Sequence, residues 1–87
     1  MYAIIVYDVG IERINKVRIF LRQYLNWVQN SVFEGELTGA EMARIKSQLK
    51  KLIKPEHDSI LFYTVKDKRW MNFDFMGKHR ADTSNIL

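Results

Sequence analysis

Asp8 is the residue whose type and position first suggest chemistry. It ends the apolar run of residues 2–7 with a carboxylate, and a turn follows at Val9 and Gly10. A carboxylate at the tip of a strand can ligate a divalent cation, or it can cap the helix that follows. No second acid, histidine or cysteine stands directly beside it to form a catalytic pair. The sequence around Asp8 therefore leaves two interpretations open, a functional acid and a cap.

Four segments have the hydrophobic pattern of strands, and these elements must position the acid. Residues 2–7 and 58–65 are apolar on both faces, as strands buried on both sides are. Residues 27–37 have mixed faces, and we expect a bend at Gly35. Residues 70–77 alternate between apolar and polar side chains, which predicts an antiparallel strand with one wetter face.

Two helices are predicted between the strands. The first starts at Ile11 and ends near Asn26, with an apolar stripe and several cations off that stripe. The second has an N-cap at Thr38, a capping box closed by Glu41, and a stop at Pro55. The order is βαββαβ if the middle strand folds back on itself, and βαβαββ if it does not. Both orders fit one sheet with two helices on one face, and the ferredoxin-like βαββαβ sandwich of the α+β class is the commonest such fold.

The size of the chain and the pattern of its strands predict a homodimer. A chain of 87 residues builds only a modest core, and oligomerisation is a common remedy. The helices shield one face of the sheet, yet the strands at residues 2–7 and 58–65 are apolar on both faces. We therefore expect two sheets to pack face to face across a two-fold axis. Residues 1–77 are expected to form the domain, and residues 78–87 a C-terminal segment.

The composition fits a small basic protein that binds a polyanion. The chain carries 14 Lys and Arg against 10 Asp and Glu, a net charge of +4. We expect nucleic acid as the partner, although a small basic protein can simply be soluble. No cysteine is present, which excludes a disulfide scaffold and a Cys-based metal site or nucleophile. Neither a cationic leader nor a long apolar segment is visible, so we expect a cytoplasmic protein with no membrane span.

Several motifs resemble those of a known family. The stretch "YDV" closes the first strand, "NKVRIFLRQYL" forms a basic amphipathic helix, and "VQNSVFEGEL" runs into "TGAEMARIKSQLKKLI". Together they resemble the small CRISPR-associated protein two family, over residues 1–77. The resemblance implies a ferredoxin-like protomer, a homodimer with facing sheets, and a C-terminal strand that pairs with the neighbouring protomer. Residues 78–87 are accordingly expected to be exchanged with the other protomer or docked on it.

The resemblance implies a part in CRISPR adaptation, in one of two roles. One role is a metal-dependent endonuclease that hydrolyses RNA or DNA. The other is a non-catalytic scaffold for the adaptation integrase, which acts on duplex DNA. A third interpretation, from the same structural class, is a toxin-like ribonuclease resembling virulence-associated protein D. We expect the endonuclease, with nucleic acid and the CRISPR adaptation integrase as partners.

Three residues match family positions and form the expected catalytic site. Asp8 matches the acid that ends the first strand, Arg18 an arginine of the first helix, and Phe33 an aromatic residue of the second-strand motif. A two-fold axis near the end of the first strand would bring two copies of Asp8 together, and two acids plus waters suit Mg²⁺ or Mn²⁺. The cation would polarise a phosphodiester and activate water, Arg18 or Arg13 would offset charge, and Phe33 would position a base or sugar.

A second set of residues is expected to contact nucleic acid. The set consists of an aromatic residue that matches the family and the cations of the first helix: Tyr7, Arg13, Lys16, Arg18 and Arg22. A wider set adds Lys50, Lys51, Lys54 and the turn at residues 66–69. Such cations bind phosphates without reading sequence. A solvated helix face explains at least two of the helix cations as well, and aromatic residues such as Phe33 more often belong to a core.

Overall fold

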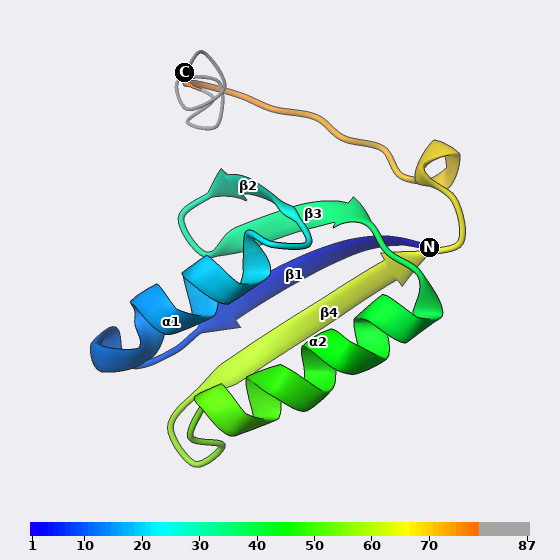
Figure 1. Ribbon diagram of the computed structural model, residues 1–87. Coiled ribbons are helices and arrows are strands. Elements are labelled where there is room, and N and C mark those ends of the chain that lie inside the picture. The colour runs from blue at the N-terminus through cyan, green and yellow to red at the C-terminus, as the bar shows by residue number, and fades with distance from the viewer. Residues whose placement is uncertain (79–87) are drawn as a thin grey trace.

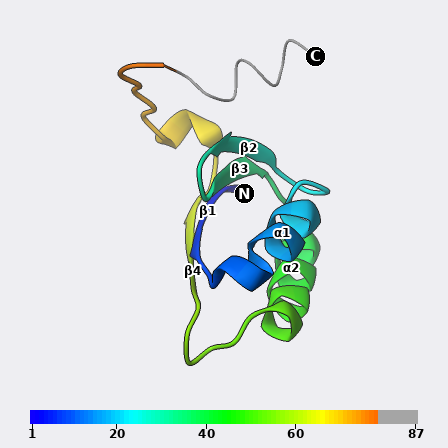
Figure 2. The ribbon, with the colours of Figure 1, turned by 90° about the vertical axis from the view of Figure 1, so that its left-hand side faces the viewer.

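Four strands form one antiparallel sheet in the computed structural model, which describes residues 1–78. The strands are β1 (Tyr2–Asp8), β2 (Asn26–Gln29), β3 (Val32–Glu36) and β4 (Ser59–Val65), and their order across the sheet is β2-β3-β1-β4. Two helices, α1 (Ile11–Leu21) and α2 (Gly39–Leu52), cover one face of this sheet, as Figure 1 and Figure 2 show. The βαββαβ order confirms the predicted α+β, ferredoxin-like fold. Within the described residues, no helix has the length and apolar character needed to cross a membrane.

The predicted capping box starts α2. The Thr38 hydroxyl accepts a hydrogen bond from the Glu41 N–H at 3.0 Å, and the Glu41 carboxylate accepts one from the Thr38 N–H at 2.9 Å. These bonds satisfy N–H groups that the first turn of a helix leaves without partners. The helix ends at Leu52, before Pro55, so both of its ends agree with the sequence pattern.

Helix α1 is shorter than its sequence pattern predicts. It ends at Leu21 and does not continue to Asn26. The N–H groups of Tyr24 and Leu25 both donate to the Leu21 carbonyl, at 3.0 and 2.9 Å, and the chain leaves the helix in this turn. Asn26 is then free to pair with β3 as the first residue of β2. Strand pairing therefore overrides the helical period at the end of α1.

The middle segment folds back on itself, but not at Gly35. The reversal lies at Asn30, which adopts the left-handed conformation with φ of 43°. Asparagine tolerates this conformation better than most residues. The register of the resulting β2–β3 hairpin shifts between Trp27 and Gln29. The predicted bend at Gly35 is wrong. A Cβ at this position would lie 2.9 Å from Leu25 Cδ2, so the Leu25 side chain would have to shift to accept a larger residue.

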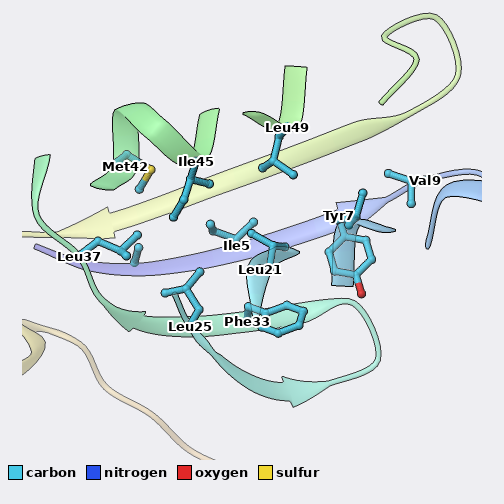
Figure 3. Packing of buried hydrophobic residues seen from close by; sticks show 12 residues of the cluster. Ile5, Tyr7, Val9, Leu21, Leu25, Phe33, Leu37, Met42, Ile45 and Leu49 are labelled. Carbon is cyan, nitrogen blue, oxygen red and sulfur yellow. The ribbon is translucent and has the colours of Figure 1, made fainter. Parts of the chain in front are cut away.

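The hydrophobic core fills the space between the sheet and the two helices (Figure 3). Its largest fully buried side chains are Phe33, Ile5, Leu21, Leu37, Ile45 and Val17. The predicted stripes of the helices point into this core, with Val17 and Leu21 on α1 and with Met42, Ile45 and Leu49 on α2. The helical side of the sheet is thus filled within one chain. The opposite side, which we call the open face, has no such layer among residues 1–78.

A buried carboxylate ties the start of α1 to the loop before β4. The Asp58 side chain has no exposed surface, and it accepts hydrogen bonds from Arg13 Nε at 2.5 Å and Nη2 at 2.8 Å. It also accepts the N–H groups of Gly10 at 2.9 Å and Lys54 at 2.8 Å. The Arg13 bonds, with the backbone donors, hold the pKa of Asp58 well below its usual range, and the pKa of Arg13 is raised in return. This arrangement, the Asp58 clasp, fixes the turn that follows Asp8.

The chain after β4 does not form the predicted strand. Lys68–Trp70 form a short 3-10 helix, η1, and residues 71–78 continue without joining the sheet. A strand is defined by pairing with a neighbouring strand, and this segment is not among the strands that pair in the sheet. The prediction of a strand over residues 70–77 is therefore wrong for a single chain. Of the predicted C-terminal segment 78–87, only the first residue lies within the described part.

Tyr2 holds the beginning of this segment against the open face. The Lys68 ammonium lies 5.4 Å from the centroid of the Tyr2 ring. Glu34, Met71 and Phe73 complete the lining of a small cavity of about 230 Å³ beside the ring. Burial, followed by the charge of Glu34 and a hydrogen bond to it, raises the pKa of Tyr2 to about 12. The phenol is therefore kept neutral across the physiological range of pH.

Replacing Asp58 by Asn should destabilise the protein strongly. The change removes the buried counter-charge of the Arg13 guanidinium and leaves it only the exposed Glu12 carboxylate, 3.7 Å away, so we expect Tm at neutral pH to fall by at least about 10 °C. In the unmodified protein, the stabilisation is present above the ordinary carboxyl pKa of 3.8 and is lost as the pH falls from there toward the depressed folded-state pKa. Thermal melts followed by circular dichroism measure both effects. Asp8→Asn is the control, and a comparable loss in that variant would contradict the prediction.

Tyr2→Phe should reduce the sensitivity of the fold to alkali. The folded-state pKa of Tyr2, about 12, exceeds its ordinary value of 10.0. Stability that depends on the neutral phenol is therefore full below pH 10.0 and is lost as the pH rises toward about 12. Melts in that interval should show Tm falling more steeply in the unmodified protein than in the variant. Parallel curves for the two proteins would rule out this role for Tyr2.

Candidate functional site

Asp8 lies at the tip of β1, on the open face of the sheet. Its neighbour on β4 is Ser59, and its side chain is exposed. The cap position of α1 is occupied by Gly10, and no side chain caps this helix. Within residues 1–78, the Asp8 carboxylate takes part in no hydrogen bond or ion pair. The cap interpretation of Asp8 is therefore wrong, and its carboxylate is available to a ligand.

One chain supplies a single acid at this position. In the described part of the chain, no three His, Cys, Asp or Glu side chains gather in a group that could hold a metal ion. Mg²⁺ keeps several waters when it binds a protein and needs only one or two carboxylates. An exposed carboxylate with no internal partner is a ligand of that kind. Asp8 thus has the character of one ligand of a cation site, and residues 1–78 add no cluster of acids or histidines around it.

Tyr7 and Phe33 lie on the opposite side of the sheet from Asp8, within the core (Figure 3). Their rings stack with centroids 6.1 Å apart, and their exposed fractions are 3% and 0%. Burial raises the pKa of the Tyr7 phenol, while the charge of Arg18 and a hydrogen bond to Ser31 oppose this rise. The expected contact of Phe33 with a base or sugar needs correction, because Phe33 has no surface to offer. Both rings instead support the end of β1 from inside the core.

Arg18 is exposed on α1, in the layer that covers the other side of the sheet. Its guanidinium donates a hydrogen bond to Asn15 Oδ1 at 2.7 Å, and its charge acts on the Tyr7 phenol. Since Asp8 faces away from the helices, one chain does not bring Arg18 and Asp8 into a common site. The predicted part of Arg18 in the reaction stays a prediction. Its exposure does leave it accessible to a phosphate.

The other predicted cations of α1 differ in their surroundings. Arg13 is held in the Asp58 clasp, with a side chain only 13% exposed, so the fold already uses its charge. Lys16 and Arg22 are exposed, and neither forms an ion pair with any residue that the structure describes. Of the predicted nucleic-acid contacts on this helix, Lys16, Arg18 and Arg22 are therefore the accessible ones.

Exposed cations outnumber acids on the helical side of the molecule, which we call the helical layer. Its exposed cations are Lys16, Arg18, Arg22, Arg44, Lys46, Lys50, Lys51 and Lys54. Its acids are Glu12, Glu41 and Glu56. On the open face the charges are mostly negative, with Asp8, Glu34 and Glu36 on the strands. Lys68 beside Tyr2 and the Met1 ammonium paired with Glu36 offset part of this negative charge, so the helical layer is the strongly cationic side of the protomer.

Sequence reasoning missed Asp58, on which the geometry near Asp8 depends. Asp58 pairs with Arg13 across a separation of 45 positions, and the sequence pattern placed it only at the start of an apolar strand. An acid at the entrance of an otherwise apolar strand is a weak signal of a buried pair. No spacing rule connects it to an arginine in a distant helix. The pairing becomes visible only once the loop before β4 is placed beside the start of α1.

Known proteins are similar to this chain in sequence and in fold. A family model described as CRISPR associated protein Cas2 matches residues 1–73. A protein named CRISPR-associated endoribonuclease Cas2, from Methanosarcina acetivorans, is 60% identical over 87 residues, which are 100% of both chains. A protein of the same name from Pyrococcus furiosus is 61% identical over 66 residues, which cover 76% of this chain and 78% of the relative.

Solved structures agree with the sequence matches. One, described as a crystal structure of Cas2, is similar with a TM-score of 0.85 and 44% identity, covering 92% of this chain and 90% of the other. The crystal structure of Streptococcus pyogenes Cas2 at pH 6.5 is similar with a TM-score of 0.78 and 34% identity, covering 88% of this chain and 100% of the other. Sequence and fold thus agree over nearly the whole length, and the chain belongs to the Cas2 family of CRISPR-associated proteins.

Proposed function

We propose that this protein is a divalent-metal-dependent endonuclease of CRISPR adaptation, and that it works as a homodimer in which two Asp8 carboxylates share one cation. The observation that carries the proposal is Asp8 itself, an exposed acid at the tip of β1 that the fold of one chain does not use. The names of the relatives from Methanosarcina acetivorans and Pyrococcus furiosus, both endoribonucleases, support the nuclease and favour RNA as its substrate.

The open face supports the second copy. Leu61 and Tyr63 on β4 remain 54% and 55% exposed, and Ile4 and Val6 beside them on β1 are only partly buried. In the register of the sheet, Val6 lies opposite Leu61 and Ile4 opposite Tyr63, so the four side chains form one continuous apolar strip. Asp8 lies at the end of this strip. Two sheets that pack through the strip across a two-fold axis bury it and can bring both acids to the same end.

Each part of the protomer has a definite task in this proposal. The two Asp8 carboxylates hold Mg²⁺ or Mn²⁺, and a bound divalent cation supplies Lewis-acid activation of the phosphodiester and of water. The Asp58 clasp keeps the turn after Asp8 rigid, so that the carboxylates meet in a fixed geometry. Lys16, Arg18 and Arg22 bind phosphates of the nucleic acid backbone without reading its sequence. The CRISPR adaptation integrase is the proposed protein partner.

Asp8→Asn should abolish divalent-dependent cleavage and leave the dimer intact. The amide keeps the size of the side chain but is a much weaker ligand for Mg²⁺, so we expect the cleavage rate to fall about 100-fold or more. The assay uses labelled single-stranded RNA and duplex DNA, with Mg²⁺ titrated and with a chelator as the blank. Asp74→Asn, an exposed acid outside the sheet, is the matched control and should cleave normally.

The same experiment tests the scaffold alternative. Cleavage by neither the unmodified protein nor the variant, combined with normal spacer integration by both in the presence of the integrase, would contradict the nuclease and leave the scaffold. Equal cleavage by the unmodified protein and the variant would show that Asp8 takes no part in the reaction. A rate that does not depend on Mg²⁺ or Mn²⁺ would exclude the shared cation.

Leu61→Lys should break the dimer, because it puts a charge into the middle of the apolar strip. We expect sedimentation at micromolar protein to show a mainly single-chain species, with cleavage falling in parallel. The matched control is Ile19→Lys on α1, where an isoleucine that is 62% exposed lies on the opposite side of the protomer. Loss of the dimer in the Ile19 variant but not in the Leu61 variant would contradict an interface on the open face and indicate one on the helical side.

A further inference from the structure

A groove lies between α2 and β4, on the helical side of the sheet and outside the site described above. Its volume is about 530 Å³, within the range of pockets that hold small organic ligands. Leu49 and Ile53 line it from the side of α2, and Ile60 and Phe62 from the side of β4. Its surface is mainly apolar and includes one aromatic ring.

The charge of the groove comes from two lysines. Lys46 and Lys50 lie one helical turn apart on α2, both line the groove, and both are exposed. The Lys46 ammonium lies 5.1 Å from the centroid of the Phe62 ring. Asp58 also borders the groove, but Arg13 and two backbone N–H groups already occupy its carboxylate. The groove therefore combines a positive rim with an apolar and aromatic floor.

We propose that this groove binds one nucleotide of a single-stranded nucleic acid. The phosphate pairs with the Lys46 and Lys50 ammonium groups, and the base packs against the Phe62 ring and Ile60. A nucleotide is both an anion and a flat apolar ring, so it satisfies the rim and the floor together. Inorganic phosphate or a nucleoside alone satisfies only one of them. The Lys46 ammonium moves from the ring to the phosphate as the base takes its place over Phe62.

The position of the groove connects it to the candidate cation site. Ser59 lines the groove and is also the strand neighbour of Asp8, so the groove ends one strand away from the acid. Strand neighbours in an antiparallel pair have Cα atoms about 5 Å apart. The groove lies on the helical side and Asp8 on the open face, so a nucleic-acid strand bound in the groove has to pass the Ser59 end of β4, at the edge of the sheet, for its phosphodiester to reach a cation held by Asp8. The inference rests on the proposed function for this last step only, because binding in the groove does not require cleavage.

Titration of the dimeric Asp8→Asn protein with a short single-stranded oligoribonucleotide tests the groove without turnover. Backbone amide shifts in NMR spectra should change for Ser47, Ile60 and Phe62, and 5′-AMP should shift the same amides with lower affinity. Lys46→Ala and Lys50→Ala should each raise the dissociation constant of the oligoribonucleotide about fivefold to tenfold, since each removes one ammonium–phosphate contact. Phe62→Leu keeps an apolar side chain but removes the ring, and should weaken binding while Tm shows that the protein is folded.

Arg44→Ala is the matched control, because Arg44 is an exposed cation of α2 that does not line the groove and belongs to neither set of expected nucleic-acid contacts. An equal loss of affinity in this variant would show that Lys46 and Lys50 act only through the overall positive charge, and it would overturn the proposal. Amide shifts confined to other surfaces, or binding of 5′-AMP but not of the oligoribonucleotide, would also overturn it. Groove binding by a protein that cleaves nothing would support the groove and sink the nuclease. Normal cleavage and normal affinity for the oligoribonucleotide in both Lys46→Ala and Lys50→Ala would overturn the groove and support the nuclease.

Discussion

The architecture near Asp8 depends on one buried ion pair. Arg13 reaches from α1 to Asp58 in the loop before β4, and the N–H groups of Gly10 and Lys54 complete the set of donors. An ionised carboxylate without exposed surface is tolerable only when its oxygens are hydrogen-bonded and its charge is paired. The Asp58 carboxylate is therefore tolerated only in the one arrangement in which Arg13 and both backbone N–H groups reach it. It determines how the chain leaves β1 and where α1 begins, and through these the direction of the strand tip.

The two sides of the protomer have different physical characters. The helical side combines a filled core with a layer of exposed lysines and arginines. The open side has an apolar strip and three acids, and no layer of its own among residues 1–78. In the proposed function, a polyanion and a second sheet would therefore meet different surfaces of the same small domain. Under that proposal, a protein of 87 residues makes the two kinds of contact on separate surfaces, without competition between them.

The sequence pattern predicted those elements whose identity depends on local periodicity. The capping box at Thr38, the apolar stripes of both helices and the doubly apolar character of β1 and β4 all agree with the structure. The end of α1 was predicted near Asn26 rather than at Leu21, because the pairing of Asn26 within the sheet is not a local property of the sequence. The bend predicted at Gly35 is wrong because a glycine that packs closely against a neighbouring side chain and a glycine in a turn look the same in a sequence.

The candidate site was predictable in part for the same reason. The position of Asp8 at the end of a strand follows from the pattern, and alternation along β1 places it on the opposite side of the sheet from Tyr7. Burial of Phe33 and Tyr7 does not follow, since alternation assigns residues to a side but does not say which side the helices cover. The role of Asp58 could not be found at all, because it results from contact between segments 45 positions apart. Residues whose roles come from tertiary contacts are the ones that sequence reasoning assigned wrongly.

The two edges of the sheet differ in a way that bears on assembly. β2 is four residues long and carries a register irregularity, whereas β4 is seven residues long and pairs regularly along its whole length with β1. Short or irregular borders resist the addition of a further chain, while long regular ones leave a straight row of unsatisfied backbone groups. A further strand can therefore add to this sheet only at the β4 edge, because the short and irregular β2 hinders pairing at the other edge.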